Sequence, residues 1–156
     1  MKLISDKMNI DIHEIIEAAK TKPFGFKAFY PGPGLGGHCI PIDPYLLTWK
    51  AKQYEMNTKF IELSADINNS MPNYVIEKIG NALNSLGINF LNSKILVIGA
   101  AYKKNVNDSR ESPSIKIIEK LYSKKVNICY HDNYLKKIKI KINKHDYSLR
   151  KKNHYL

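Results

Sequence analysis

The chain has 156 residues, of which 44% are hydrophobic and 25% are charged, as in folded globular proteins. It contains no run of about 18 apolar residues, which excludes a helix that crosses a membrane. The formal net charge is +11, but residues 124–156 alone hold ten Lys or Arg against two acids. We therefore expect a solvated or frayed basic tail over residues 136–156, and no nucleic-acid-binding surface.

The two cysteines, Cys39 and Cys129, are too few for a disulfide framework, so we expect both as reduced thiols. The first residues lack the long apolar segment of a signal peptide, which favours a cytoplasmic protein. Histidines and cysteines show no metal-ligand spacing, so we expect no metal site.

The first half of the chain is predicted to be helical. Asp11 and Glu14 form a capping box at one helix start, and Gly87 is a stop signal for the last helix. Asp43 is expected to cap a third helix that Pro44 opens. Residues 22–42 are rich in Gly, Pro and aromatic residues, and predict a long structured loop. In chain order the helices are expected over residues 3–8, 12–19, 44–51, 58–69 and 72–86.

The second half has an α/β pattern. Residues 94–99 form a short apolar run of the buried, parallel-strand type, and residues 126–130 form another. Between them, Ser112 and Pro113 mark a helix start. A strand, a crossover helix and a strand within about 37 residues predict a right-handed βαβ unit. His131 and Asp132 follow the second strand and are assigned no role.

Residues 32–37 match the G-x-G-x-x-G pattern of dinucleotide-binding sites. That pattern binds a pyrophosphate only when a strand precedes it and a helix opens on it. Here Phe29, Tyr30 and Pro31 precede it, and Cys39 to Pro41 follow, so we reject this interpretation.

Cys39 is the strongest candidate in the sequence for a reactive side chain. The glycines before it leave its surroundings open to a substrate, and His38, Asp43 and a predicted helix start lie nearby. Positive charge and helix dipoles favour thiolates, which are the reactive form of cysteine. The alternative is a small buried hydrophobic residue, the usual environment of a lone cysteine.

Two segments resemble one protein family. PGPGLGGHCIPIDPYLLTWKA (residues 31–51) resembles the active-site loop of the UDP-glucose/GDP-mannose dehydrogenase family, and VIGAAYKKNVNDSRESPS (residues 97–114) resembles its nucleotide-sugar domain. The likeness extends over about residues 1–132, and is closest to the branch that oxidises UDP-N-acetyl-hexosamines, UDP-N-acetylglucosamine in particular. It implies a helical, dimerisation-type central region over residues 1–87. A partial Rossmann-like parallel α/β domain that binds the UDP-sugar would then occupy residues 88–156.

The resemblance also implies roles for individual residues. Cys39 matches the catalytic cysteine, and Asp43 the aspartate that assists it and positions the hydrolytic water. Lys103 matches a lysine that contacts the substrate, and Arg110 an arginine that reaches toward the nicotinamide cofactor. Without the resemblance, Lys103, Lys104 and Arg110 would be interpreted as a solvated basic loop. The positions in the loop that wraps the sugar nucleotide are Phe29, Tyr30, Gly34, Gly36 and Gly37.

The implied reaction oxidises the sugar C6 alcohol to an acid with two NAD. The thiohemiacetal on the cysteine is converted to a thioester, which water cleaves. The family's enzymes begin with an NAD-binding domain that has no counterpart here, and the likeness fades after Asp132. We therefore expect an internal fragment or the product of an interrupted gene, inactive alone. NAD would be bound mainly by a missing domain, which a separate chain or a longer natural chain would supply.

The expected partners are a UDP-sugar and a second copy of the chain, which would pair through the central helices, with no membrane and no nucleic acid. The alternatives are an inactive remnant that binds a UDP-sugar or dimerises, and a basic nucleic-acid-binding module.

Overall fold

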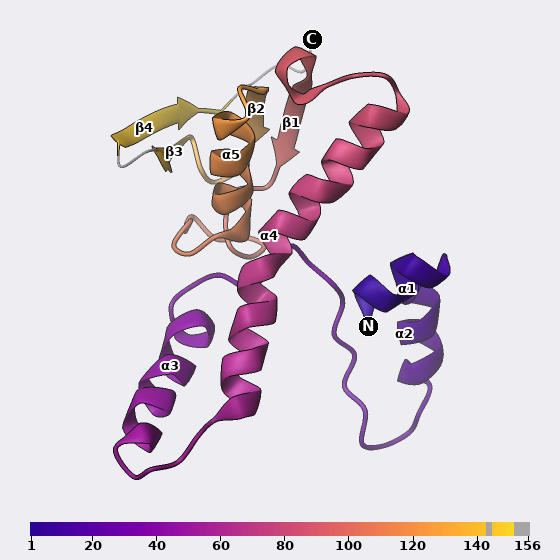
Figure 1. Cartoon of the computed structure of the whole chain (residues 1–156), viewed down its shortest axis with the longest axis vertical. Coiled ribbons are helices and arrows are strands. Elements are labelled where there is room, and N and C mark those ends of the chain that lie inside the picture. Colours follow the sequence, from indigo (N-terminus) through magenta and orange to yellow (C-terminus); the bar gives the residue numbers. More distant parts are fainter. Residues whose placement is uncertain (143–144, 152–156) are drawn as a thin grey trace. The chain divides into compact units, whose positions relative to one another are not determined.

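The computed structural model describes residues 1–142 and 145–151. The chain separates into two compact units, residues 1–32 and residues 33–156. In the first unit, α1 (Lys2–Met8) and α2 (Ile12–Lys20) lie where the sequence predicts them (Figure 1). The Asp11 carboxylate accepts a hydrogen bond from the backbone N–H of His13 at 2.8 Å, which confirms the predicted cap of α2.

The second unit begins with two helices, α3 (Cys39–Lys52) and α4 (Lys59–Ser85), which pack against each other (Figure 1). The prediction that α3 starts at Pro44 is wrong, because the helix begins five residues earlier. Pro41 falls within the first turn of α3, whose N–H groups have no partner inside the helix. A proline there therefore costs little, and it does not delay the helix start.

The predicted break between residues 69 and 72 is also wrong, because α4 continues through Pro72. Proline removes one backbone hydrogen bond from a helix interior. Here Pro72 and Ile76 are both buried, and α4 packs against α5 (Pro113–Ser123). Tertiary packing thus outweighs the local preference to stop. At the far end, Gly87 has φ +68° and the N–H of Ile88 bonds to the carbonyl of Leu83 at 3.0 Å, which confirms the predicted stop.

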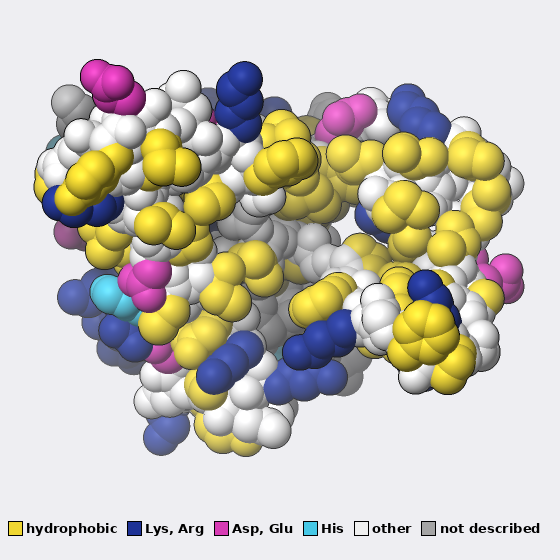
Figure 2. Space-filling view, turned by 90° about the horizontal axis from the view of Figure 1, so that it is seen from below, with side chains coloured by type: hydrophobic (Ala, Val, Ile, Leu, Met, Phe, Trp, Pro, Cys, Tyr) yellow, Lys and Arg dark blue, Asp and Glu magenta, His cyan; other side chains and the backbone are white. Residues whose placement is uncertain are grey.

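Many apolar side chains are exposed on α3 and α4, and Figure 2 shows apolar side chains across the face it views. Those on these two helices include Ile40, Leu46, Leu47, Trp49, Phe60 and Leu63. None of the helices in the described part of the chain is long and apolar enough to cross a membrane.

The α/β part is built as the sequence predicts. After a short 3₁₀ turn, η1 (Phe90–Asn92), β1 (Lys94–Ile98) pairs in parallel with β2 (Asn127–His131), and α5 connects them. Ser112 precedes α5, and Pro113 is its first residue. This βαβ unit places the ends of β1 and β2 at the same edge of the sheet.

The expected frayed tail is instead a hairpin. β3 (Lys137–Ile142) pairs antiparallel with β4 (His145–Arg150), whereas residues 143–144 and 152–156 lie outside the described residues. The reason is the alternation of Lys and Ile in β3, which places lysines in solvent and isoleucines inside. Ile138 and Ile140 are each only 1% exposed. In the sequence, the many lysines favoured a solvated tail, although the alternation of Lys and Ile every second residue is typical of a half-buried strand.

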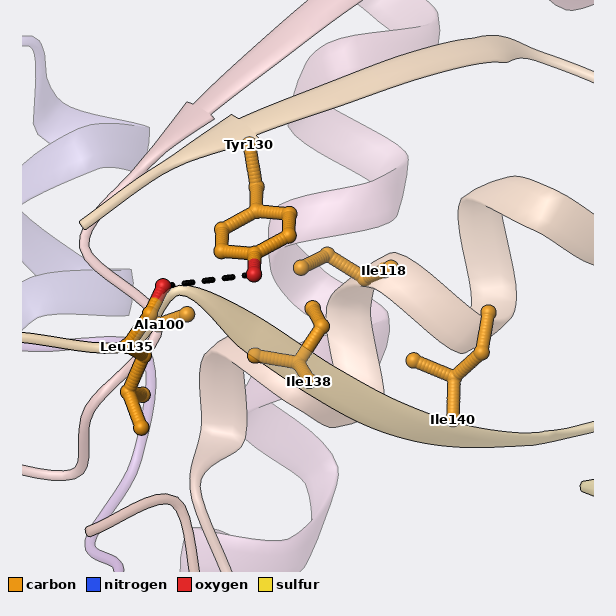
Figure 3. Packing of buried hydrophobic residues seen from close by; sticks show 6 residues of the cluster. All are labelled: Ala100, Ile118, Tyr130, Leu135, Ile138 and Ile140. Atoms are coloured by element: carbon orange, nitrogen blue, oxygen red, sulfur yellow. Dashed lines mark hydrogen bonds between the residues drawn. The ribbon is translucent and has the colours of Figure 1, made fainter. Parts of the chain in front are cut away.

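The hairpin completes the main core of the chain. Figure 3 shows Ile138 and Ile140 beside Ile118 of α5 and Tyr130 of β2, with the Tyr130 hydroxyl donating a hydrogen bond to the Leu135 carbonyl at 3.3 Å. A second cluster joins α4 to the α/β part, and consists of Ile76, Ile117, Leu121 and Val126.

Candidate functional site around Cys39

Cys39 is the first residue of the 14-residue helix α3, and it is exposed. The sequence placed the helix start just beyond this residue, whereas the structure puts the thiol on the helix N-terminus itself. Unpaired N–H groups and the helix dipole at that end favour a negative charge. Asp43, also exposed, follows at i+4 and therefore lies on the same face of α3, one turn further on.

The glycine segment before Cys39 packs against the turn that follows β1. The N–H of Gly37 donates to the carbonyl of Arg110 at 3.0 Å. A Cβ atom on Gly37 would lie 2.8 Å from the Tyr102 ring, and one on Gly36 would lie 2.7 Å from the carbonyl oxygen of Glu111. Glycine is therefore needed at these two positions because a side chain would collide with the protein's own atoms. The sequence alone does not indicate this reason.

α4 holds the other side of this segment. The Asn68 side chain accepts a hydrogen bond from the N–H of Leu35 at 2.6 Å. A Cβ atom on Gly34 would lie 3.3 Å from Cβ of Pro113 and 3.4 Å from the Asn68 carbonyl. Sequence reasoning missed both Asn68 and Tyr102, since their roles come from packing between segments that are far apart in the chain.

The basic residues of the site lie on the segment between β1 and α5. Arg110 is exposed, and its guanidinium Nη2 lies 2.7 Å from Oδ2 of Asp108. The hydrogen bond to Asp108 is the main cause of the raised pKa of Arg110, and weaker Coulombic interactions with Tyr102 and Cys39 act in the same direction. The Arg110 backbone lies beside the glycine segment, because its carbonyl accepts the hydrogen bond from Gly37, two residues before Cys39. The same pair lowers the pKa of Asp108, mainly through the Arg110 hydrogen bond.

Lys103 is also exposed, and its Nζ lies 5.4 Å from the centre of the Tyr102 ring. Tyr102 therefore contacts the glycine segment and Lys103 together. The structure brings Cys39, Gly36, Gly37 and the Lys103–Arg110 segment into one region of the second unit.

Phe29 and Tyr30 belong to the first unit, so the structure does not place them with Cys39. The Tyr30 hydroxyl donates to Glu17 Oε1 at 2.6 Å, and this hydrogen bond raises the pKa of Tyr30. The Tyr30 ring also stacks on His13 at 6.0 Å between centroids. Phe29 is exposed, and Lys27 Nζ lies 5.6 Å from the centre of its ring.

A mainly apolar groove of about 300 Å³ lies between α3 and α4, next to Cys39. Its lining includes Leu35, Ile40, Tyr45 and Phe60. Within residues 1–142 and 145–151, no three His, Cys, Asp or Glu side chains come together as a metal-binding group.

Two family models match the chain. The central domain of the UDP-glucose/GDP-mannose dehydrogenase family matches residues 1–70, and the UDP binding domain of the same family matches residues 96–154. The chain belongs to this family. The second match includes β3 and β4, so the expectation that the family pattern fades after Asp132 is wrong.

Among curated family members, the UDP-N-acetyl-D-mannosamine dehydrogenase of Methanococcus vannielii is 39% identical over 129 residues, which are 83% of this chain and 29% of that protein. The UDP-N-acetyl-D-glucosamine 6-dehydrogenase of Salmonella typhi is 36% identical over 130 residues, or 82% of this chain and 30% of that protein.

The solved UDP-D-ManNAc dehydrogenase structure of Pyrococcus horikoshii aligns with a TM-score of 0.77 at 33% identity, over 85% of this chain and 31% of that one. This likeness confirms the predicted α/β fold class with a Rossmann-like UDP-binding domain. The chain spans about three tenths of the length of these relatives.

Proposed function

We propose that this chain supplies the thiol and the nucleotide-sugar contacts of an NAD-dependent dehydrogenase. The enzyme would oxidise the C6 hydroxyl of a UDP-N-acetyl-hexosamine to a uronic acid. The observation that supports it best is the position of Cys39, exposed on the first residue of α3 and two residues after Gly37, whose N–H donates to the Arg110 carbonyl. The names of the relatives favour an N-acetyl-hexosamine over glucose as the sugar.

In the proposed reaction Cys39 adds to the C6 aldehyde of the sugar. The sulfur–carbon bond forms, and the thiol proton passes to the former carbonyl oxygen, giving a thiohemiacetal. After oxidation to the thioester, water attacks the carbonyl carbon and the Cys39 sulfur leaves. Asp43 lies on the same face of α3 as Cys39, where its carboxylate can orient that water. The covalent route divides one difficult oxidation into easier steps.

The sugar nucleotide carries a diphosphate, which suits cationic side chains. Lys103 is proposed to contact it, and the loop residues Phe29, Tyr30, Gly34, Gly36 and Gly37 are proposed to surround the sugar nucleotide. Because Gly36 and Gly37 are packed against Glu111 and Tyr102, their part would be to shape this surface through their backbone atoms.

When bound, NAD supplies the hydride acceptor. The described residues do not form a cradle for a dinucleotide: no strand precedes residues 32–37, and the N–H groups of Ala100 and Ala101 after β1 donate to Asp132. We therefore propose that NAD is bound mainly by a domain outside this chain, and that Arg110 reaches toward it. On this proposal, the boundary between the two domains of the chain lies near residue 87. The central region with the catalytic loop precedes it, and the UDP-sugar domain follows it.

The exposed apolar side chains of α3 and α4 favour a homodimer through the central helices. The second candidate function is an inactive remnant that binds a UDP-sugar or dimerises. The exposed apolar side chains of α3 and α4 would serve its dimerisation in the same way.

Binding of the sugar nucleotide can be tested by calorimetry with UDP-N-acetylglucosamine and UDP-N-acetylmannosamine. We expect Lys103→Ala to weaken binding severalfold and the neighbouring Lys104→Ala to leave it unchanged. Equal affinities for both variants would contradict the role of Lys103. We also expect no NAD reduction by the chain alone, and turnover without any added NAD domain would refute the fragment interpretation.

A further inference from the structure

Asp132 directly follows β2, and the residue is only 6% exposed. Each of its oxygens accepts two backbone hydrogen bonds. Oδ2 accepts from Ala100 at 2.8 Å and Ala101 at 3.0 Å, and Oδ1 accepts from Tyr134 at 2.8 Å and Leu135 at 2.9 Å. One side chain thus holds the turns that follow β1 and β2 together.

The charge of Asp132 is stabilised by these contacts. Burial opposes ionisation, but the four N–H donors outweigh it and lower the pKa of the carboxyl below its ordinary value. The residue is therefore an anion at neutral pH, and its hydrogen bonds are of the strong, charge-assisted kind.

The turn held by Asp132 continues directly to the site. Tyr102 follows Ala101, and its N–H donates to the carbonyl of Asp108 at 3.0 Å. The Tyr102 ring fills the space beside Gly37, and the Gly37 N–H bonds to the Arg110 carbonyl. Gly37 is two residues before Cys39, so an unbroken series of contacts runs from the Asp132 carboxylate to the residue that carries the thiol.

We propose that Asp132 is a positioning residue for Cys39. It fixes the turn after β1, this turn seats the Tyr102 ring against the glycine segment, and the segment sets the place of the first residue of α3. Asp132 touches neither the sugar nor the thiol, and its effect passes through Tyr102 and the backbone. The functional side of this inference rests on the role proposed above for Cys39.

Asp132→Asn tests the inference, because the amide keeps the size of the side chain but removes the charge and one acceptor oxygen. Asp146→Asn, at an exposed aspartate of β4, is the matched control with the same charge change. Amide hydrogen exchange by NMR is the readout. We expect the amides of Ala100, Ala101 and Gly37 to exchange at least about tenfold faster in Asp132→Asn, while amides of α5 stay protected. Ala100 and Ala101 lose their charged acceptor directly, whereas Gly37 is affected through the loosened turn that carries Tyr102 and Arg110.

Faster exchange at Ala100 and Ala101 with no change at Gly37 would overturn the proposal, because Asp132 would then hold only its own turn. If Asp132→Asn does not fold, Tyr102→Ala tests the same link from its other end. That variant keeps the carboxylate contacts, so Ala100 and Ala101 should stay protected while Gly37 exchanges faster. Unchanged protection of Gly37 in this variant would also overturn the proposal.

A second readout separates this inference from the proposed function. This readout is the affinity for the C6 aldehyde of a UDP-N-acetyl-hexosamine, measured through its adduct with Cys39. Compared with the wild-type chain, we expect an affinity about tenfold lower in Asp132→Asn and an unchanged affinity in Asp146→Asn. An adduct of equal affinity in both variants would refute the positioning role alone. No adduct in the wild-type chain would refute the role of Cys39, and the exchange data would still decide whether Asp132 controls the glycine segment.

Discussion

Gly37→Ala is expected to destabilise the second unit strongly. Gly37 has φ +89°, and a Cβ atom there would lie 2.8 Å from the Tyr102 ring. A side chain in left-handed backbone costs about 1–2 kcal/mol, and overpacking costs about 1–3 kcal/mol. The free energy of unfolding should therefore fall by about 3 kcal/mol, which in a chain of this size lowers Tm by about 6–12 °C.

Urea unfolding followed by circular dichroism measures this loss. Gly32→Ala is the matched control, because no atom lies within 4 Å of the position of its Cβ and its φ is not left-handed. We expect its stability to change by less than about 1 kcal/mol. In a double-mutant cycle, Tyr102→Ala should recover the overpacking part of the Gly37→Ala loss, about 1–3 kcal/mol. If Gly37→Ala is as stable as Gly32→Ala, the packing of the glycine segment described here is incorrect.

Three further predictions concern other parts of the chain. In the same urea assay, Ile140→Ala should lower the free energy of unfolding by about 2–5 kcal/mol, and the adjacent Lys139→Ala by less than about 0.5 kcal/mol. Equally small losses in both variants would mean that β3 is not part of the core. The pKa of Asp132 is lowered from 3.8, so the stability that its charge gives the folded chain is present above pH 3.8 and is lost as the pH falls through the folded-state pKa. In acid titrations, the free energy of unfolding should therefore fall less steeply with decreasing pH in Asp132→Asn than in the wild-type chain. Parallel curves would show that the pKa of Asp132 is not lowered by folding. Iodoacetamide should alkylate the exposed Cys39 faster than the half-buried Cys129, as followed by mass spectrometry of the digested chain, and the reverse order would contradict the exposure of the thiol.

Local signals in the sequence predicted most of the α/β part. Ser112 and Pro113 at a helix start, and apolar runs at both strands, each act within a few residues, and the parallel pairing follows from the crossover helix between them. The long helix α4 was predicted as two, because a proline in the middle is a strong local stop. Only the burial of Pro72 against the rest of the second unit explains why the helix continues.

The candidate site was predictable in part. Cys39 could be selected from its motif, but the packing of Gly37 on Tyr102 joins segments more than 60 residues apart in the chain. No role was assigned to Asp132, because an aspartate after a strand is common and its four backbone donors come from two separate turns. Such contacts have no signature in a single sequence.

The central claim is that Cys39 is the nucleophile, and it can be tested without NAD. The C6 aldehydes of UDP-N-acetylglucosamine and UDP-N-acetylmannosamine, labelled with ¹³C at C6, would be added to the chain and followed by NMR. Addition of the thiol converts the aldehyde carbon to a thiohemiacetal carbon with its own resonance, with no oxidant required. We predict this resonance with the wild-type chain and with Cys129→Ser, and its loss in Cys39→Ser. The same spectrum from Cys39→Ser as from the wild-type chain would contradict the claim.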